Sequence, residues 1–288
     1  MLSDTNIMVN FKKTFFLLLI LGNIFNWWLI ITNFKIVPAV SFLEVGQGDA
    51  ELIQTVAGNI LIDTGPSNKI LFALGEVLPF NDKTLDLVIL SHPNKDHYNG
   101  LFDLLEQYHV RAVLLNNLTY PSSTFQKLIE ELKKKGIPLI KGEAGVNISW
   151  QTSDSLKIIF PPADQFFNLN SNASGIVALL SLARNQVLFP GDINFSQEQK
   201  IVPFLKNLPL GTRILKVSHH GSSQASSQAF LETFKPELAI IEVGENSYGQ
   251  PSPEALERLK EVGAKVLRTD LNGTIKLFID KEGILRVK

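Results

Sequence analysis

The chain has no cysteine among its 288 residues. This absence excludes disulfides, cysteine-ligated zinc and thiol nucleophiles, so any bound metal must be held by His, Asp, Glu or Asn. Histidine is also scarce, because only five are present, and four of them form two tight clusters: His92 with His97, and His219 with His220. So uneven a distribution of a scarce ligand type indicates a functional site.

The chain also lacks a strong net charge. Its 27 basic and 28 acidic residues leave a net charge of −1. No global basic field is available to bind nucleic acid, although a local basic patch remains an alternative. No internal repeat or low-complexity stretch is evident. Hydrophobic residues make up 45% of the chain, which is enough for one large α/β domain or two small ones.

Residues 14–32 contain no charged side chain. As a helix this stretch reaches roughly 28 Å, close to the hydrocarbon thickness of a bilayer. We therefore expect a transmembrane helix over 14–32, a cytoplasmic N-terminus over 1–13 and an extracytoplasmic domain over 33–288, in a single-pass protein of the cytoplasmic membrane. The orientation follows from Lys12 and Lys13, which precede the stretch, while only Lys35 closely follows it. A cleaved signal peptide and a buried helix are the alternatives.

The remaining pattern alternates between apolar strands and amphipathic helices. Strands are predicted over 36–45, 50–55, 59–63, 85–90 and 111–116, and helices over 99–109, 123–135, 196–206, 226–234 and 252–262. Strand hairpins mixed with helices predict two sheets covered by helices, which is a layered α/β protein.

Polar residues suited to chemistry occur where apolar strands end. Asp63 ends one strand, His92, Asn94, Asp96 and His97 follow another, and Asp192 and the pair His219–His220 end two more. Loops at strand ends gather functional groups in α/β folds, and carboxylates with imidazoles bind zinc, manganese or iron. Residues 92, 94 and 97 can fold over one ion while Asp96 points to a neighbouring site. The alternative for Asp96 is a helix cap.

The motifs as a set resemble a known family. The segment SHPNKDH at 91–97 is similar to the HxHxDH signature of the metallo-β-lactamase superfamily. The segments FLEVGQGDA (42–50), ILIDTG (60–65), LFPGD (188–192), KVSHHGS (216–222), YGQPSPE (248–254) and LRTDLNGTI (267–275) resemble one branch of it. That branch comprises the extracytoplasmic hydrolase domain of ComEC-type competence proteins and stand-alone relatives.

The resemblance implies a four-layer αββα sandwich and one or two divalent metal ions, zinc or manganese. It implies that His92 binds the first metal, that Asp96, His97 and His219 bind the second, and that Asp192 bridges both. It makes His220 a candidate proton donor and Asp96 a candidate base for the attacking water. Asp63 then supports the His92 loop, and Asp49 lies near the site.

The chain departs from the family pattern at three places. Asn94 stands where the superfamily has His, Gln250 stands where the branch commonly has His, and the middle histidine ligand is replaced by the stretch around Asn172 and Ser174. We therefore expect the second metal position to be the stronger one. Tyr248 is a candidate substrate contact, or else a loop residue.

The function expected from this resemblance is metal-dependent hydrolysis of DNA or another phosphodiester outside the cytoplasmic membrane, with a separate DNA-uptake channel as a possible partner. The alternative is a degenerate, non-catalytic module of the same fold that binds DNA or a partner. For three other polar residues we expect structural roles. His109 is expected to end a helix, and Asp270 with Asn272 to form a hairpin turn, with a substrate-binding loop as the alternative.

Overall fold

A computed structural model of the chain describes residues 13–27, 38–116, 119–151, 154–163, 172–279 and 285–288. The chain divides into two compact units, Met1–Ile36 and Val37–Lys288. In the first unit the structure describes a helix over 13–27 with exposed side chains. Across the described residues, no helix combines the length and apolar character needed to cross a bilayer. Residues 28–32 of the predicted transmembrane segment lie outside the described residues.

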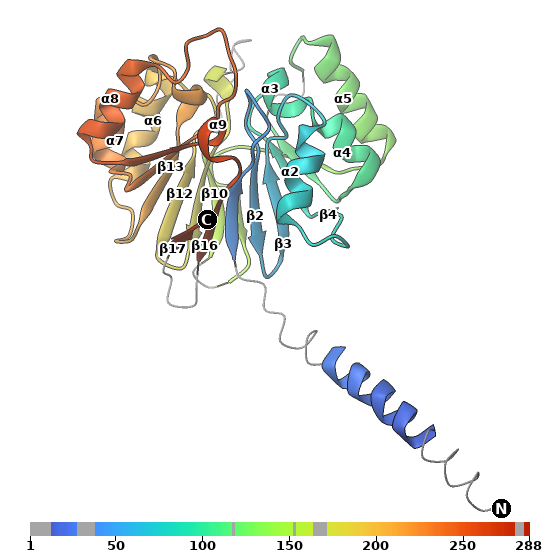
Figure 1. Cartoon of the computed structure of the whole chain (residues 1–288). Helices are drawn as coiled ribbons and strands as arrows, with labels where there is room; N and C mark the ends of the chain where they lie inside the picture. The colour runs from blue at the N-terminus through green and yellow to red at the C-terminus, as the bar shows by residue number, and fades with distance from the viewer. Residues whose placement is uncertain (1–12, 28–37, 117–118, 152–153, 164–171, 280–284) are drawn as a thin grey trace, which may run out of the picture. The chain divides into compact units, whose positions relative to one another are not determined.

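The second unit contains two large sheets, and each has helices on one side (Figure 1). The first sheet has the strand order β17-β16-β1-β2-β3-β5-β7-β8, and the second has the order β15-β14-β13-β12-β11-β10-β9. The strands of the first sheet are β17 (Leu285–Val287), β16 (Ile275–Ile279), β1 (Ala39–Phe42), β2 (Glu51–Thr55), β3 (Gly58–Ile62), β5 (Leu87–Leu90), β7 (Val113–Leu115) and β8 (Leu139–Lys141). Those of the second are β15 (Lys265–Arg268), β14 (Leu238–Ile241), β13 (Arg213–Lys216), β12 (Asn185–Phe189), β11 (Val177–Leu182), β10 (Ser155–Phe160) and β9 (Asn147–Ser149). A small sheet pairs β4 (Thr84–Leu85) with β6 (His109–Val110).

Three hydrophobic clusters define four layers. The middle cluster joins the facing sides of the two sheets, with Phe42 stacked on Phe189 at 6.0 Å between ring centroids. A second cluster packs α2 (Lys69–Val77), α4 (Leu101–Gln107) and α5 (Ser123–Lys134) on the outer side of the first sheet. A third packs α6 (Phe195–Leu205), α7 (Gln228–Phe234) and α8 (Pro253–Glu261) on the second. The predicted layered α/β sandwich is therefore confirmed.

Most helix boundaries agree with the sequence prediction because caps define them. Ser122 accepts a hydrogen bond from the Phe125 backbone at the start of α5, and Ser252 does the same for Ala255 at the start of α8. Two local predictions need correction. His109 does not end a helix but begins the short strand β6, because α4 has already ended at Gln107. Asp270 and Asn272 lie in a one-turn helix, α9 (Thr269–Asn272), because the Asn272 side chain accepts from the Arg268 backbone and bends the chain into a turn of helix.

The direction of the central strands determines where the polar residues gather. Strands β3, β5 and β7 are parallel neighbours, as are β12, β13 and β14. Their carboxyl ends all lie at one edge of the sandwich, and the helices that follow run back to the opposite end (Figure 1). Loops from both sheets therefore meet at this edge.

Candidate metal centre

Asp192 is the central acid of the buried cluster at this edge. The Nε2 atoms of four histidines surround its Oδ2 atom, at 3.3 Å for His97, 3.8 Å for His220 and 3.9 Å for both His92 and His219. Ligand atoms around a tetrahedral zinc ion are about 3.3 Å apart, since each bond is about 2.05 Å long. The spacing of this cluster is therefore that of a metal site.

Asp192 also belongs to a group of four side chains that could hold a metal ion. Asp96, His97, Asp192 and His220 each offer one ligand atom, and these atoms all lie within 4.8 Å of one another. His97, Asp192 and His220 are buried, while the side chain of Asp96 is 36% exposed. The group therefore has three buried candidate ligands and one carboxylate that solvent reaches.

The three buried histidines form hydrogen bonds through Nδ1, and Nε2 of each lies toward the acids of the cluster, with His220 Nε2 3.4 Å from Asp96 Oδ2. His97 Nδ1 donates to Asp63 Oδ2 over 2.7 Å, and His220 Nδ1 donates to the Glu242 carbonyl over 2.9 Å. The Ser91 hydroxyl donates to Asp63 Oδ2 and so accepts from His92 Nδ1, over 3.0 Å. These partners place a proton on every Nδ1, so Nε2 is the nitrogen that each histidine would offer to a metal ion, as metal-binding histidines do.

Unpartnered atoms support the same conclusion. Among the described residues, His92 Nε2, His97 Nε2 and Asp192 Oδ1 are buried without a hydrogen-bond partner. Buried polar atoms rarely remain unpaired, so a group that is part of the functional state is expected to satisfy them. The donor set of imidazole nitrogens and carboxylate oxygens fits a divalent metal ion.

The electrostatic field of the cluster also favours a cation. Burial alone would lower the pKa of His220, but the charges of Asp192 and Asp49 outweigh burial and raise this pKa to about 10. Burial would raise the pKa of Asp192, yet His97 and His220 hold it well below its usual range. His92 behaves differently, because burial and the neighbouring His97 lower its pKa to about 3. His92 is therefore neutral and able to bind a metal at physiological pH.

Three residues of the cluster have a strained backbone conformation. Asp63, His219 and His220 all have positive φ, at 53°, 52° and 51°, a conformation that residues other than glycine seldom adopt. Such strain is typical of functional sites, where surrounding contacts hold the residue in place. The successive left-handed residues direct His220 into the cluster and leave His219 35% exposed at its rim.

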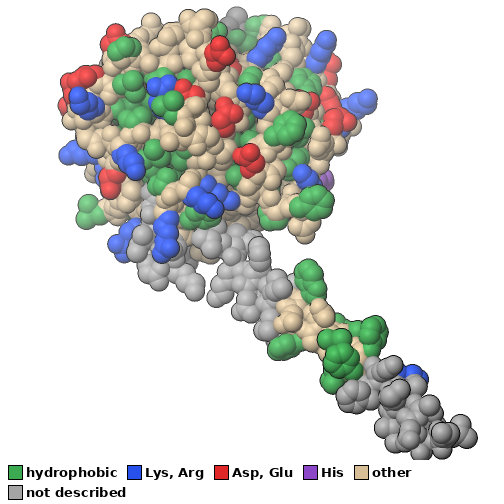
Figure 2. All heavy atoms as spheres, in the orientation of Figure 1, with side chains coloured by type: hydrophobic (Ala, Val, Ile, Leu, Met, Phe, Trp, Pro, Cys, Tyr) green, Lys and Arg blue, Asp and Glu red, His purple; other side chains and the backbone are tan. Residues whose placement is uncertain are grey.

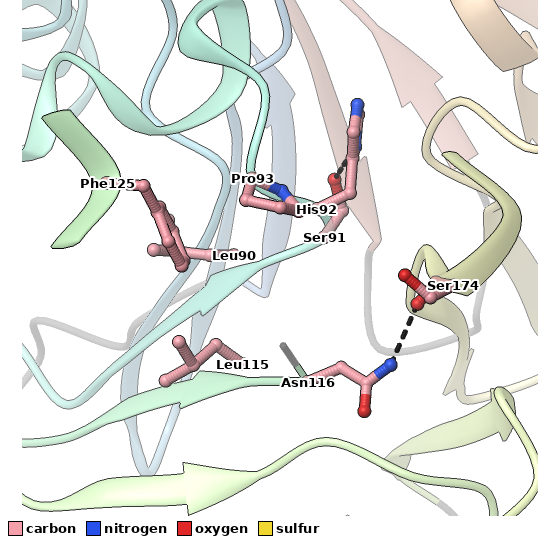
Figure 3. Close-up of a pocket in the computed structure, with 8 residues that line it drawn as sticks. All are labelled: Leu90, Ser91, His92, Pro93, Leu115, Asn116, Phe125 and Ser174. Carbon is pink, nitrogen blue, oxygen red and sulfur yellow. Dashed lines mark hydrogen bonds between the residues drawn. The ribbon is translucent and has the colours of Figure 1, made fainter. Parts of the chain in front are cut away.

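Three residues stand where the family pattern has histidines: Asn94, and Asn172 or Ser174 for the middle ligand. Asn94 Nδ2 donates to Asn172 Oδ1 over 3.0 Å, so these two candidates lie together. Ser174 lies beside a small pocket behind Ser91 and His92, where its carbonyl accepts from Asn116 over 2.9 Å (Figure 3).

Gln250 and Tyr248 lie on the loop that packs against the GQGD segment at 46–49. Gln250 accepts a hydrogen bond from Gln47 over 2.8 Å, two residues before Asp49, so the 244–252 loop lies against the GQGD segment. Tyr248 is 77% exposed on that loop. Gly48 has no room for a side chain, since a Cβ atom there would collide with the carbonyl of Asp96. The GQGD segment is thus a close backbone contact beside the cluster.

The sequence motifs did not identify Lys216 as part of the site. Lys216 is fully buried, and its ammonium group donates to Asp49 Oδ2 and to the Gly191 carbonyl, 3.6 Å from Asp192 Oδ1. Burial alone would lower its pKa, but Asp49 and Asp192 raise it above the usual range, so Lys216 stays charged. A lysine inside the apolar strand RILK was the available signal, because lysine is rarely buried unless it is paired.

Comparisons with known proteins agree with this geometry. The sequence profile of the metallo-β-lactamase superfamily matches residues 43–244. The chain is 27% identical over 257 residues to "ComE operon protein 3" of Bacillus subtilis, covering 82% of this chain and 32% of that protein. It is 29% identical over 246 residues to "Recombination protein 2" of Haemophilus influenzae, covering 83% of this chain and 28% of that protein. The chain therefore spans about a third of the length of these relatives.

Solved structures show the same fold at low identity. The diiron β-hydroxylase CmlA of Streptomyces venezuelae aligns with a TM-score of 0.55 at 13% identity, covering 84% of this chain and 54% of that chain. The metallo-β-lactamase fold protein YhfI of Bacillus subtilis aligns with a TM-score of 0.52 at 13% identity, covering 87% of this chain and all of that chain. The resemblance drawn from the sequence motifs is confirmed, and the chain belongs to the metallo-β-lactamase superfamily, with ComEC-type competence proteins among its relatives.

Proposed function

We propose that the chain is a metal-dependent phosphodiesterase that cleaves DNA outside the cytoplasmic membrane, to which residues 14–32 anchor it. The observation that carries the hydrolase part is the convergence of Asp96, His97, Asp192 and His220. Relatives named for competence and recombination favour DNA as the phosphodiester. The apolar stretch 14–32 supports the anchor, and a separate DNA-uptake channel remains a proposed partner.

In this proposal His97, Asp192 and His220 hold the metal ion, zinc or manganese, with Asp96 as the ligand nearest to solvent. When bound, such an ion supplies Lewis acidity to a phosphoryl oxygen and makes water more acidic. His92 offers a further imidazole to the same centre or to a second ion. The roles first assigned to the adjacent histidines are exchanged: His220 becomes the ligand and the half-exposed His219 becomes the residue that reaches substrate.

Asp96 is the proposed base of the reaction. Burial would raise its pKa, but His97 lowers it below the usual value, so the carboxylate is charged at neutral pH. Its exposed position lets it accept a proton from an attacking water, while its contact with His220 Nε2 at 3.4 Å fixes its orientation. Asp63 orients His97, and Ser91 orients His92, through the hydrogen bonds described above.

The test is cleavage of single-stranded and double-stranded DNA by the full chain, purified in detergent, after chelation and after return of Mn²⁺ or Zn²⁺. We expect no cleavage after chelation, cleavage after metal return, and a loss of about 100-fold or more in Asp96→Ala. Asp103→Ala and His109→Ala are matched controls outside the cluster. Cleavage that survives in both Asp96→Ala and His220→Ala would contradict the proposal and favour a non-catalytic binding module.

A further inference from the structure

Three apolar side chains are exposed at the end of the domain opposite the metal cluster. Phe80 is 95% exposed, Leu210 is 94% exposed and Val56 is 52% exposed. Each lies in the loop before a strand whose other end reaches the cluster: Val56 precedes β3, Phe80 precedes β4 and β5, and Leu210 precedes β13. We call this end, defined by Val56, Phe80, Leu210 and the start of β1 at Ala39, the tether face.

Hydrogen bonds hold the loops of the tether face in position. Asn59 at the start of β3 donates to Asp82 over 2.9 Å and to the Thr84 carbonyl over 3.1 Å, which joins the loop of Val56 to that of Phe80. The loop of Leu210 is fixed where Gln186 donates to the Thr212 carbonyl over 2.9 Å. These loops precede β3 and β5 of the first sheet and β13 of the second, and the parallel strands of both sheets begin at the same end of the sandwich (Figure 1).

Cationic side chains accompany these apolar residues. Lys83, Arg184 and Lys206 are exposed in the same loops and in the turn beside them, and none forms an ion pair with a described residue. Figure 2 shows that Lys and Arg side chains predominate in the lowest part of the domain in that view. Lys206 at the end of α6 has a local reason in the helix dipole, and Lys83 donates to the Tyr108 hydroxyl over 3.1 Å. Those reasons do not account for a phenylalanine and a leucine that are almost fully exposed.

The chain also enters the domain at this end. The Pro38 carbonyl accepts from the Ile279 backbone over 3.0 Å, and Ala39 pairs with Gln54 and Phe278 at the end of the first sheet. Only residues 33–38 separate the apolar stretch 14–32 from β1. Six extended residues reach about 20 Å at most. With 14–32 in a bilayer, this short stretch is the connection between the lipid and the tether face.

We infer that the tether face rests on an anionic lipid surface. Phe80 and Leu210 enter the boundary between headgroups and acyl chains, and Lys83, Arg184 and Lys206 contact headgroup phosphates. The inference rests on the proposed anchoring by residues 14–32. Its consequence is that the metal cluster, at the opposite edge, faces the aqueous phase, where a long polymer can approach it.

The absence of cysteine makes the test direct, because one introduced cysteine carries one label. Phe80→Cys and Leu210→Cys in the full chain are labelled with a polarity-sensitive fluorophore and reconstituted in vesicles of about 70% phosphatidylcholine and 30% phosphatidylglycerol. Tyr248→Cys, on an exposed loop beside the metal cluster, is the matched control. We expect blue-shifted emission and at least about twofold quenching by spin-labelled lipid at positions 80 and 210 but not at 248.

Three other outcomes overturn the inference, and they are distinguishable. Labels at 80 and 210 as exposed to water as the label at 248 would show that the face does not meet lipid. Labels shielded from water yet not quenched by spin-labelled lipid would show a protein contact, such as a second copy. A chain that does not float with vesicles would contradict the anchoring itself. Label emission, quenching and vesicle flotation do not depend on metal or on hydrolysis. A failure of the hydrolase proposal would therefore leave these measurements unchanged.

Discussion

Lys216 and Asp49 form a completely buried ion pair beside the metal cluster, although they are 167 residues apart in sequence. Lys216 comes from β13 of the second sheet and Asp49 from the loop before β2 of the first. The same ammonium group lies 3.6 Å from Asp192 Oδ1. The pair therefore joins the two sheets at the point where the ligand loops meet.

Loss of this pair is expected to destabilise the fold independently of metal. Lys216→Met leaves the Asp49 carboxylate buried without its cation, and such a change costs about 3–5 kcal/mol. Urea unfolding in the presence of chelator measures the loss. Lys157→Met, at an exposed position of β10, is the matched control and should change stability by less than about 0.5 kcal/mol. A double variant Lys216→Met with Asp49→Asn should lose less than the sum of the single changes.

The two adjacent histidines are expected to differ in metal binding. His220 is buried in the group that also contains Asp96, His97 and Asp192, whereas His219 is 35% exposed at its rim. His220→Ala should lower the affinity for Zn²⁺ or Mn²⁺ at least about tenfold more than His219→Ala, because it removes a fixed ligand. Titration of the chelated protein with metal gives both affinities. Retention of metal by His220→Ala together with its loss in His219→Ala would assign the ligand role to His219 instead.

Asp63 is expected to act on metal through His97. Its carboxylate accepts from His97 Nδ1 over 2.7 Å and from the Ser91 backbone over 2.7 Å. Asp63→Ala frees the imidazole to rotate, and loss of such a supporting contact typically lowers metal affinity about 10- to 100-fold. The same metal titration, with Asp103→Ala for comparison, measures the effect. An unchanged affinity would show that packing alone orients His97.

Arg258 is expected to stabilise the loop that follows the paired histidines. Its guanidinium donates to the carbonyls of Ser223, Ala225 and Ser226, at 3.0, 2.8 and 2.8 Å. Arg258→Ala should cost about 1.5–3 kcal/mol in unfolding free energy, as for other hydrogen bonds to a charged group. Arg258→Lys should recover only part of this, because one ammonium cannot reproduce the planar fork. Full recovery by lysine would show that charge, and not geometry, matters here.

Glu198 is expected to make stability depend on pH. Burial raises the pKa of its carboxyl, and hydrogen bonds from Ser227 only partly oppose the shift from the ordinary 4.5. A folded pKa above the unfolded one means that the contribution of Glu198 is fully present below pH 4.5 and is lost as pH rises through the folded value. The stability of the wild type relative to Glu198→Gln should therefore fall as pH rises from 4.5. Denaturant unfolding across this range measures it, and a relative stability that rises with pH would contradict it.

Much of the candidate site is local in sequence, which is why it was predictable. His92, Asp96 and His97 lie within six residues after an apolar strand, and Asp192 ends another. The hydrophobic periodicity placed the strands and the amphipathic helix α5, and the Ser252 cap placed the start of α8. Strand direction then brings these loops to one edge, because parallel strands share their carboxyl ends.

The sequence by itself determined the layered fold, the kinds of ligand available and the loops that carry them, since these depend on composition and local periodicity. Only the tertiary structure decided that His220 is buried in the cluster and that His219 lies at its rim, because the left-handed backbone of both residues sets the direction of each side chain. Only it paired Lys216 with Asp49, because that contact crosses from one sheet to the other. The apolar strand around Lys216 marks this lysine as unusual, but local sequence cannot show that its partner lies on the other sheet.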